Sequence, residues 1–161
     1  MDKNQNKSKW NALECALLIM LAVCLLMGAA ALSRQDRLQQ KMIRLHVVAN
    51  SDSQRDQALK LQVRDKVLAF TETTMRAAAD RQEANRTLQA ALPTIQAMAE
   101  ETLRENGCED RVETRLEPVE FPLKTYSGFR LPAGEYLALR VLIGKAEGQN
   151  WWCVVYPPLC M

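Results

Sequence analysis

An apolar run from Trp10 to Leu32 divides this 161-residue chain into a short N-terminal segment and a longer, regularly patterned remainder. Residues 1–9 are polar and carry three lysines, and small residues from Gly28 to Ala31 lie near the end of the run. A basic start, an apolar middle and a small-residue end are typical of a secretory signal, with cleavage expected after Ala31. The run also approaches the roughly 20 residues that span a bilayer, so an uncleaved signal anchor is the alternative.

We therefore expect residues 1–34 to be a signal peptide or signal anchor, and residues 35–161 to form one extracytoplasmic domain. The lysines before the apolar run are expected to stay in the cytoplasm, which leaves the rest of the chain outside. With 21 Lys and Arg against 19 Asp and Glu, the formal net charge is only +2. No basic stripe stands out, so we expect no nucleic-acid partner.

The last dozen residues, 150–161, hold two tryptophans, two cysteines and the pair Pro157-Pro158. The segment is typical of a strand that ends in a turn, with Cys153 and Cys160 on either side of that turn. Export would allow these thiols to oxidise, and a turn could bring the two backbones within bridging range. The spacing predicts a Cys153–Cys160 disulfide, and the alternative is that both thiols and that of Cys108 are free.

Periodicity in the remainder predicts the element order β-α-α-β-β-β. Strands are expected at residues 42–49, 110–117, 135–143 and 151–156 because apolar and polar residues alternate there. Apolar residues three and four positions apart predict a helix after Ser53 and a second helical region that ends at Gly107. Pro93 lies inside the second region, so either the helix kinks or a new helix starts there.

The connections follow from prolines and glycines. Pro118 is expected to end its strand, residues 121–134 to form a long ordered loop, and residues 144–149 to form a hairpin loop. The economical arrangement is a two-layer α+β domain with the helices on one face of a mainly antiparallel sheet. An N-terminal signal or transmembrane helix precedes it.

His46 is the single histidine of the chain and points away from the face that carries Leu45 and Val47. A structural or surface role is favoured, because no cluster of His, Cys and Asp has the spacing of metal ligands. A hydrolase that pairs His46 with Cys108 or Ser51 is the enzymatic alternative. We expect no catalytic residue, no metal, no cofactor and no small-molecule ligand.

Adjacent tryptophans on a strand face opposite sides, so one of Trp151 and Trp152 is expected to be exposed. An exposed tryptophan beside an aromatic loop would anchor an interface, although the loop could instead cover both indoles. The predicted partner-contact residues are Tyr126, Phe129, Arg130, the exposed member of Trp151 and Trp152, and, as a second patch at a strand-to-helix junction, Asn50 and Asp52.

Three blocks of the sequence resemble the stage II sporulation protein R family. They are Ile43–Ser53 followed by Asp56–Asp65, then Leu131–Tyr136 with Ala138–Val141, and finally Gly148–Cys160. The helical segments between them are looser. The combination is specific, although each short piece alone would be weak.

The resemblance implies an exported signal of endospore formation, made in the forespore and released into the space between the two membranes or anchored in the forespore membrane by residues 10–32. Its implied partner is a membrane-embedded protease of the mother cell, which trims the inactive sigma-E precursor. The family is not known for an enzymatic activity, so no catalytic residue is carried over. Family members are expected to continue past the residue matching Cys160, whereas this sequence ends at Met161. A membrane-anchored structural subunit is a further alternative.

Overall fold

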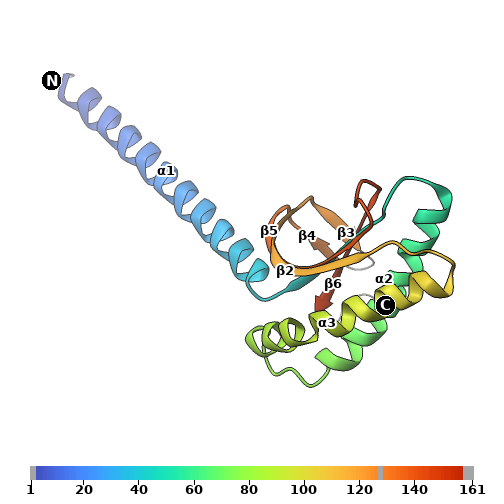
Figure 1. The fold of residues 1–161 in the computed structure, drawn as a ribbon. Coiled ribbons are helices and arrows are strands. Elements are labelled where there is room, and N and C mark those ends of the chain that lie inside the picture. The colour runs from blue at the N-terminus through green and yellow to red at the C-terminus, as the bar shows by residue number, and fades with distance from the viewer. Residues whose placement is uncertain (1–2, 127–128, 158–161) are drawn as a thin grey trace. The chain divides into compact units, whose positions relative to one another are not determined.

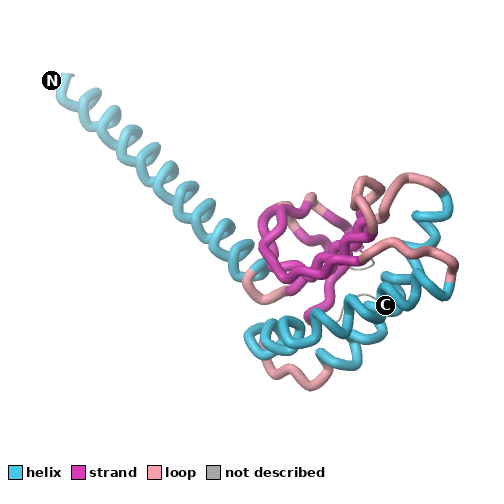
Figure 2. Tube along the Cα trace, in the orientation of Figure 1, coloured by secondary structure: helices cyan, strands magenta, loops and turns pink. Residues whose placement is uncertain are grey.

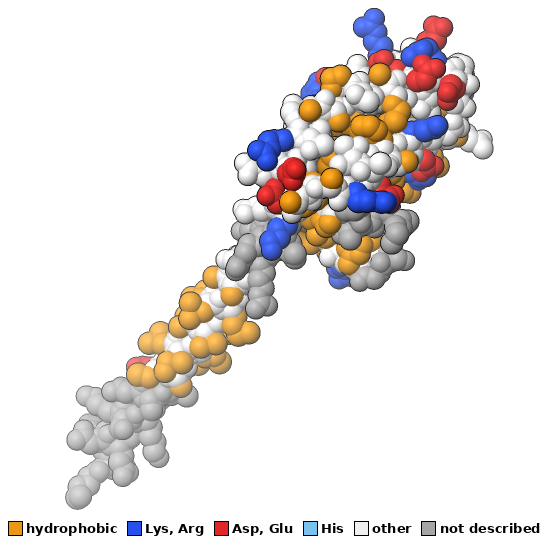
Figure 3. Space-filling model, turned by 90° about the horizontal axis from the view of Figure 1, so that it is seen from below, with side chains coloured by type: hydrophobic (Ala, Val, Ile, Leu, Met, Phe, Trp, Pro, Cys, Tyr) orange, Lys and Arg blue, Asp and Glu red, His pale blue; other side chains and the backbone are white. Residues whose placement is uncertain are grey.

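The computed structural model describes residues 3–126 and 129–157, with the side chains of residues 3–13, 31–32 and 34–38 set aside. The chain divides into two units, Met1–Leu38 and Gln39–Met161. Helix α1 (Lys3–Gln39) makes up the first unit and ends at the first residue of the second. Apolar side chains such as Leu18, Leu26 and Met27 are 65–70% exposed along it. Figure 3 shows hydrophobic side chains on the surface of this helix.

The described residues include no helix that is both long enough and apolar enough to cross a membrane. The assignment of residues 1–34 to a signal or an anchor thus stays a prediction.

The second unit is an α+β domain (Figure 1). In chain order its elements are β1 (Ile43–Val48), α2 (Gln54–Met75), α3 (Arg81–Glu105), β2 (Val112–Phe121), β3 (Lys124–Tyr126), β4 (Phe129–Leu131), β5 (Gly134–Ile143) and β6 (Asn150–Tyr156). The predicted order β-α-α-β-β-β is confirmed for the six longer elements. Figure 2 shows the two helices side by side along one face of the sheet.

The main sheet is mixed, with the strand order β2-β5-β1-β6. Strand β1 runs parallel to β5, while the β1–β6 and β2–β5 pairs are antiparallel. The prediction of a mainly antiparallel sheet therefore holds for two pairings of three. The predicted hairpin at 144–149 is wrong, because β1 lies between the strands that this segment joins.

The connection from β5 to β6 instead passes the end of β1 and forms backbone hydrogen bonds with the residues that follow this strand. The backbone N–H of Gly148 donates to the carbonyl of Ala49 at 2.9 Å, and that of Glu147 donates to the carbonyl of Asn50 at 3.2 Å. A short loop rich in glycine is typical of a hairpin. Here the same residues cross over a neighbouring strand, because both β5 and β6 pair with β1.

Pro118 does not end β2, which continues to Phe121 with Pro118 opposite Leu137. The strand lies at the edge of the sheet, and an edge position is where the missing N–H of proline is tolerated. The predicted irregular loop at 121–134 is also wrong in part, because it contains the short hairpin β3–β4. Pro93 lies within a continuous helix α3, so no new helix starts there.

The core lies between the helices and one face of the main sheet. Ile43, Leu45 and Val47 of β1 are fully buried there. Val63 and Val67 of α2, together with Leu88 and Ile95 of α3, complete this layer. Each side chain of this size contributes about 1.5–3 kcal/mol when it leaves water. The alternation that places these residues inward places the neighbouring residues of the sheet on its other face.

The first turns of α2 and α3 are both capped by side chains. The Ser53 hydroxyl accepts a hydrogen bond from the Asp56 N–H at 3.1 Å, and the Asp80 carboxylate accepts one from the Glu83 N–H at 2.8 Å. Such caps satisfy N–H groups that have no partner within the helix. The cap at Ser53 fixes where α2 starts after β1.

Candidate interaction site on the open face of the sheet

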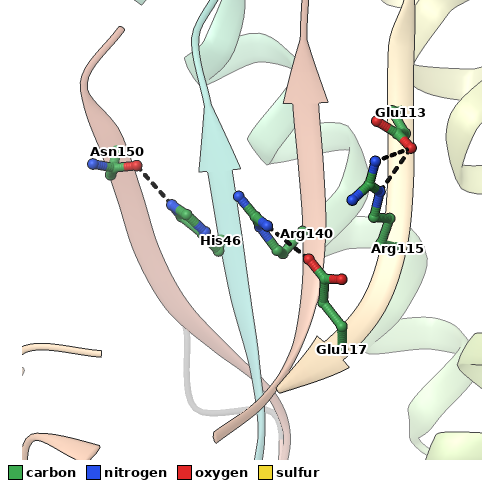
Figure 4. Close-up of polar contacts among 6 residues, drawn as sticks. All are labelled: His46, Glu113, Arg115, Glu117, Arg140 and Asn150. Carbon is green, nitrogen blue, oxygen red and sulfur yellow. Dashed lines mark hydrogen bonds and ion pairs between the residues drawn. The ribbon is translucent and has the colours of Figure 1, made fainter. Parts of the chain in front are cut away.

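The face of the sheet opposite the helices carries a row of polar side chains (Figure 4). Strand register places His46 of β1 beside Trp152 of β6 on one side and Arg140 of β5 on the other. Arg140 in turn lies opposite Arg115 of β2. Residues two apart on a strand share a face, so Arg44 of β1 joins the same surface.

His46 occupies the centre of this row and is only 5% exposed. Its imidazole stacks on the indole of Trp152, with ring centroids 3.9 Å apart and planes inclined by 10°. Its Nε2 forms a 2.7 Å hydrogen bond with Oδ1 of Asn150, which makes Nε2 the protonated nitrogen of the neutral ring. The predicted orientation of His46, away from Leu45 and Val47, is thereby confirmed.

Burial lowers the pKa of His46, the Asn150 hydrogen bond raises it in part, and the positive charge of Arg140 lowers it further. The imidazole is therefore neutral at neutral pH. Its Nδ1 is buried and has no hydrogen-bond partner in the described residues. The ring is thus neutral, stacked on Trp152 and hydrogen-bonded to an amide oxygen.

Two ion pairs continue the row toward the β2 edge. Arg140 Nη1 lies 2.6 Å from Glu117 Oε1, with side-chain exposures of 27% and 33%, respectively. Arg115 Nη2 lies 2.6 Å from Glu113 Oε1, and both of these side chains are about half exposed. Exposed pairs of this kind contribute at most about 1 kcal/mol to stability, so they mainly set the charge pattern of the surface.

A second cluster on the same face of the sheet surrounds Arg44, which is fully buried. Its guanidinium carbon lies 3.9 Å from the ring centroid of Phe121 and 4.9 Å from that of Tyr136. Its Nη2 donates a 2.6 Å hydrogen bond to the hydroxyl of Tyr126. Burial lowers the pKa of Arg44, and the nearby Tyr126 hydroxyl partly offsets this effect.

The predicted contact residues of the β3–β4 hairpin divide between this cluster and the surface. Tyr126 is half-buried, because its hydroxyl meets Arg44 and also donates to the Trp152 carbonyl at 3.5 Å. Phe129 stacks on Tyr126 with centroids 4.9 Å apart, and Arg130 is exposed. Tyr126 thus links the hairpin to the open face of the sheet.

Trp151 is the more exposed of the two adjacent tryptophans, at 36%, and it lies on the helix side of β6. The guanidinium of Arg64 on α2 stacks over its indole at 4.2 Å. Trp152 faces the opposite side, where it packs against His46 and Phe121. The structure therefore places Trp151 and the hairpin residues on different faces and does not bring them together.

Asn50 and Asp52, the second predicted patch, hydrogen-bond to the β5–β6 connection. The Asn50 Oδ1 accepts from the Lys145 N–H at 2.9 Å, and the Asp52 Oδ1 accepts from the Gln149 N–H at 2.8 Å. Asn50 Nδ2 also donates to the carboxylate of Asp56 at 3.1 Å. Hydrogen bonds, chiefly from the Ser51 hydroxyl, lower the pKa of Asp56. These groups hold the junction between β1 and α2 in place.

In the hydrolase alternative, His46 would pair with Ser51 or Cys108, but Ser51 and His46 form hydrogen bonds with other residues. The Ser51 hydroxyl donates to Asp56 at 2.6 Å, and the hydrogen bond of His46 is to Asn150. Burial raises the pKa of the Cys108 thiol, which favours the less reactive protonated form. Within the described residues, no group of three or more His, Cys, Asp or Glu side chains could hold a metal ion.

Cys15, Cys24 and Cys108 are free thiols. Cys153 is buried in β6, opposite Leu45. Cys160 lies outside the described residues, so its pairing with Cys153 stays a prediction.

Sequence reasoning missed the roles of Arg44 and of the Arg140–Glu117 pair. A signal for Arg44 was present, because it alternates with His46 in a strand that is otherwise apolar, and a charge in a buried strand needs partners. The aromatic partners come from distant segments, and nothing in the local pattern identifies them. Arg140 is likewise a charged residue among the apolar residues of β5.

Residues 39–161 match the family model described as stage II sporulation protein R. The chain belongs to the stage II sporulation protein R family. A relative named Stage II sporulation protein R, from Bacillus subtilis strain 168, is 41% identical over 118 residues. The aligned part covers 73% of this chain and 53% of the relative, so the chain spans about half the length of that relative. No solved structure matches the chain.

The family match confirms the resemblance that the three sequence blocks indicated, since all of them lie within residues 39–161. Membership supports a role in sporulation. His46 and Arg44 on the open face, and Trp151 and Trp152 in β6, all belong to these blocks.

Proposed function

We propose that this protein is an exported signal of endospore formation that triggers a membrane-embedded protease in the mother cell. The protease then trims the inactive precursor of sigma-E. Membership of the stage II sporulation protein R family carries this proposal, because the resemblance of the sequence to that family implies this role. The protein acts as a ligand for the protease and performs no chemistry of its own.

Export rests on the N-terminal unit. Its lysines precede an apolar segment whose side chains, such as Leu18 and Leu26, are exposed along α1. The apolar part of a secretory signal needs only about 7–15 residues, fewer than a membrane span. We therefore propose residues 1–34 as the signal that carries the domain across the forespore membrane, with retention as an anchor the alternative.

A ligand of this kind needs a surface with a few side chains that bind strongly. Trp, Tyr and Arg dominate the binding energy of many interfaces. Two surfaces here carry them: a hairpin patch of Tyr126, Phe129 and Arg130, and a tryptophan patch of Trp151 with Arg64 stacked on it. We propose that the receptor protease contacts the hairpin patch and Trp151.

Separate variants test the two patches, because they lie on different faces. In sporulating cells that lack their own copy of the protein, Arg130→Ala and Trp151→Ala are each expected to reduce trimming of the sigma-E precursor at least fivefold. Arg86→Ala on the exposed side of α3 is the matched control and should leave trimming unchanged. Immunoblots of the precursor and of the exported protein give the measurement.

If both variants are exported at normal levels and the precursor is trimmed as much as with the parent chain, the proposed surfaces are wrong. If the parent chain itself restores no trimming, the proposed role in signalling is wrong.

A further inference from the structure

The guanidinium of Arg44 has hydrogen-bonding capacity that this domain leaves unused. The side chain is 0% exposed, yet its Nε and Nη1 have no hydrogen-bond partner in the described part of the chain. Within those described residues, only Nη2 donates a hydrogen bond, to the hydroxyl of Tyr126. A buried donor without a partner costs about 1–3 kcal/mol, and more when it belongs to a charged group. Such an arrangement persists where another interaction compensates for it.

Among the described residues, the surroundings of Arg44 supply aromatic faces but no carboxylate paired with it. Among the described residues, the ion pairs join Arg64, Arg76, Arg104, Arg115 and Arg140 to neighbouring carboxylates, and Arg44 is absent from them. Phe121 and Tyr136 attract the cation through their ring faces. Rings provide no lone pair that points along an N–H bond. The described residues thus hold the charge in place but do not neutralise it.

The positions of the free nitrogens define what would fit. A guanidinium binds a carboxylate through two parallel N–H groups, either Nε with Nη2 or Nη1 with Nη2. Nη2 is common to both pairs, and the Tyr126 hydroxyl occupies it at 2.6 Å. One of the two nitrogens is therefore already free in each pair, and the second becomes free when this hydroxyl moves.

We propose that Arg44 is a binding site for a carboxylate group, which takes the place of the Tyr126 hydroxyl on Nη2. The carboxylate would gain two charge-assisted hydrogen bonds and would neutralise a buried charge, where electrostatic attraction is stronger than in water. The guanidinium that it would bind lies over the rings of Phe121 and Tyr136. The carboxylate belongs either to a free small acid or to an acidic side chain of the receptor protease, and this second source rests on the proposed function.

The Nε–H signal of Arg44 in ¹H–¹⁵N spectra reports binding directly. The full chain is titrated with sodium acetate, with sodium chloride at equal ionic strength as the control. In a second arm it is mixed with the extracytoplasmic part of the protease. We expect a saturable shift of the Arg44 signal with acetate, with the protease or with both, and none with chloride. Acetate alone would identify a free acid, and the protease alone a protein side chain.

Tyr126→Phe keeps the ring but removes the hydroxyl from Nη2, so we expect it to bind the same carboxylate at least threefold more tightly. Arg44→Lys keeps the charge but lacks the paired N–H groups, and we expect it to weaken binding at least tenfold, measured on the Trp152 indole N–H signal. Circular dichroism checks the fold of each variant. The proposal is overturned if neither acetate nor the protease shifts the signal saturably in the parent chain or in Tyr126→Phe.

Failure of the proposed function would have a different signature. The Arg44 signal would shift saturably with acetate or with the protease, while the protein triggered no trimming of the sigma-E precursor. Conversely, trimming that proceeds normally in a folded Arg44→Lys variant, without any saturable shift in the parent chain, would retain the signalling role and remove the carboxylate site.

Discussion

The imidazole of His46 lies flat against the indole of Trp152, with 3.9 Å between the ring centroids. The two residues sit opposite each other on β1 and β6, so this stack joins the first strand of the domain to the last. Phe121 from β2 meets both rings edge-on. On this face of the sheet, ring contacts therefore join segments that are far apart in the sequence.

Protonation of His46 is expected to destabilise the domain. Its pKa is lowered by burial and by Arg140, so the folded state resists protonation that the unfolded chain accepts near its ordinary value of 6.5. The unfolded state then binds more protons, and the free energy of unfolding falls as the pH drops below about 6.5. This contribution is fully present above that pH.

Urea unfolding of the parent chain and of His46→Gln, at pH values from about 7.5 to about 5.5, measures the effect. The parent is expected to lose more stability than the variant over this interval. Asp56, whose pKa is lowered below 3.8, responds only at lower pH and does not obscure the comparison. Equal pH dependence in the two proteins would contradict a buried neutral His46.

The two adjacent tryptophans are expected to destabilise the domain to different extents when truncated. Trp152→Ala removes the ring that covers His46 and Phe121, and should lower the free energy of unfolding by about 2–4 kcal/mol. Trp151→Ala removes a partly exposed ring stacked on Arg64, and should cost at most about 1 kcal/mol. Denaturant unfolding of both variants, side by side, gives the comparison, and equal losses would mean that the assignment of faces is wrong.

Gly148 is expected to tolerate no side chain. A Cβ at this position would meet the backbone carbonyl of Ser51 and the Cβ of Ala49, where the β5–β6 connection passes the end of β1. We expect Gly148→Ala to lower the free energy of unfolding by about 2 kcal/mol or more. Gly107→Ala is the matched control: its φ of +67° is strained for alanine, but the nearest atom, Arg55 Nη2, would lie at an ordinary contact distance of 3.9 Å, so the loss should be about 1 kcal/mol. A smaller loss at Gly148 than at Gly107 would contradict this crossing.

We expect Cys153 and Cys160 to be joined by a disulfide in the exported protein. Peptide mapping by mass spectrometry, without reduction and with free thiols blocked, should recover the two cysteines in one linked species, and Cys108 as a blocked thiol. Recovery of all three cysteines as blocked thiols would show that the bond does not form.

Much of the fold follows from the alternation of side chains, since one buried face is enough to predict the strands around Leu45, Val112 and Val141. The predictions that were wrong concern features that depend on long-range contacts. Pro118 was expected to end its strand, and only the position of β2 at the sheet edge makes proline acceptable there. The 144–149 segment has the composition of a hairpin, but its path is decided by β1, which is about a hundred residues earlier in the chain.

In the candidate site, too, some features follow from the local sequence pattern and others depend on distant segments. That His46 faces away from the core follows from the period of a strand, and that one of two adjacent tryptophans is exposed follows in the same way. Which tryptophan is exposed depends on where α2 packs. The environment of Arg44 depends on Phe121, Tyr126 and Tyr136, which come from three later segments, so no local pattern predicts it.

Reconstitution with defined sides tests the central claim most directly. The full chain is added to vesicles that contain the candidate protease and the sigma-E precursor, either at the extracytoplasmic face of the protease or at its cytoplasmic face. The account predicts trimmed precursor only when the protein reaches the extracytoplasmic face, and less of it with Trp151→Ala. Trimming that is independent of the protein, or that occurs only from the cytoplasmic face, would contradict the proposal that this chain is the exported signal.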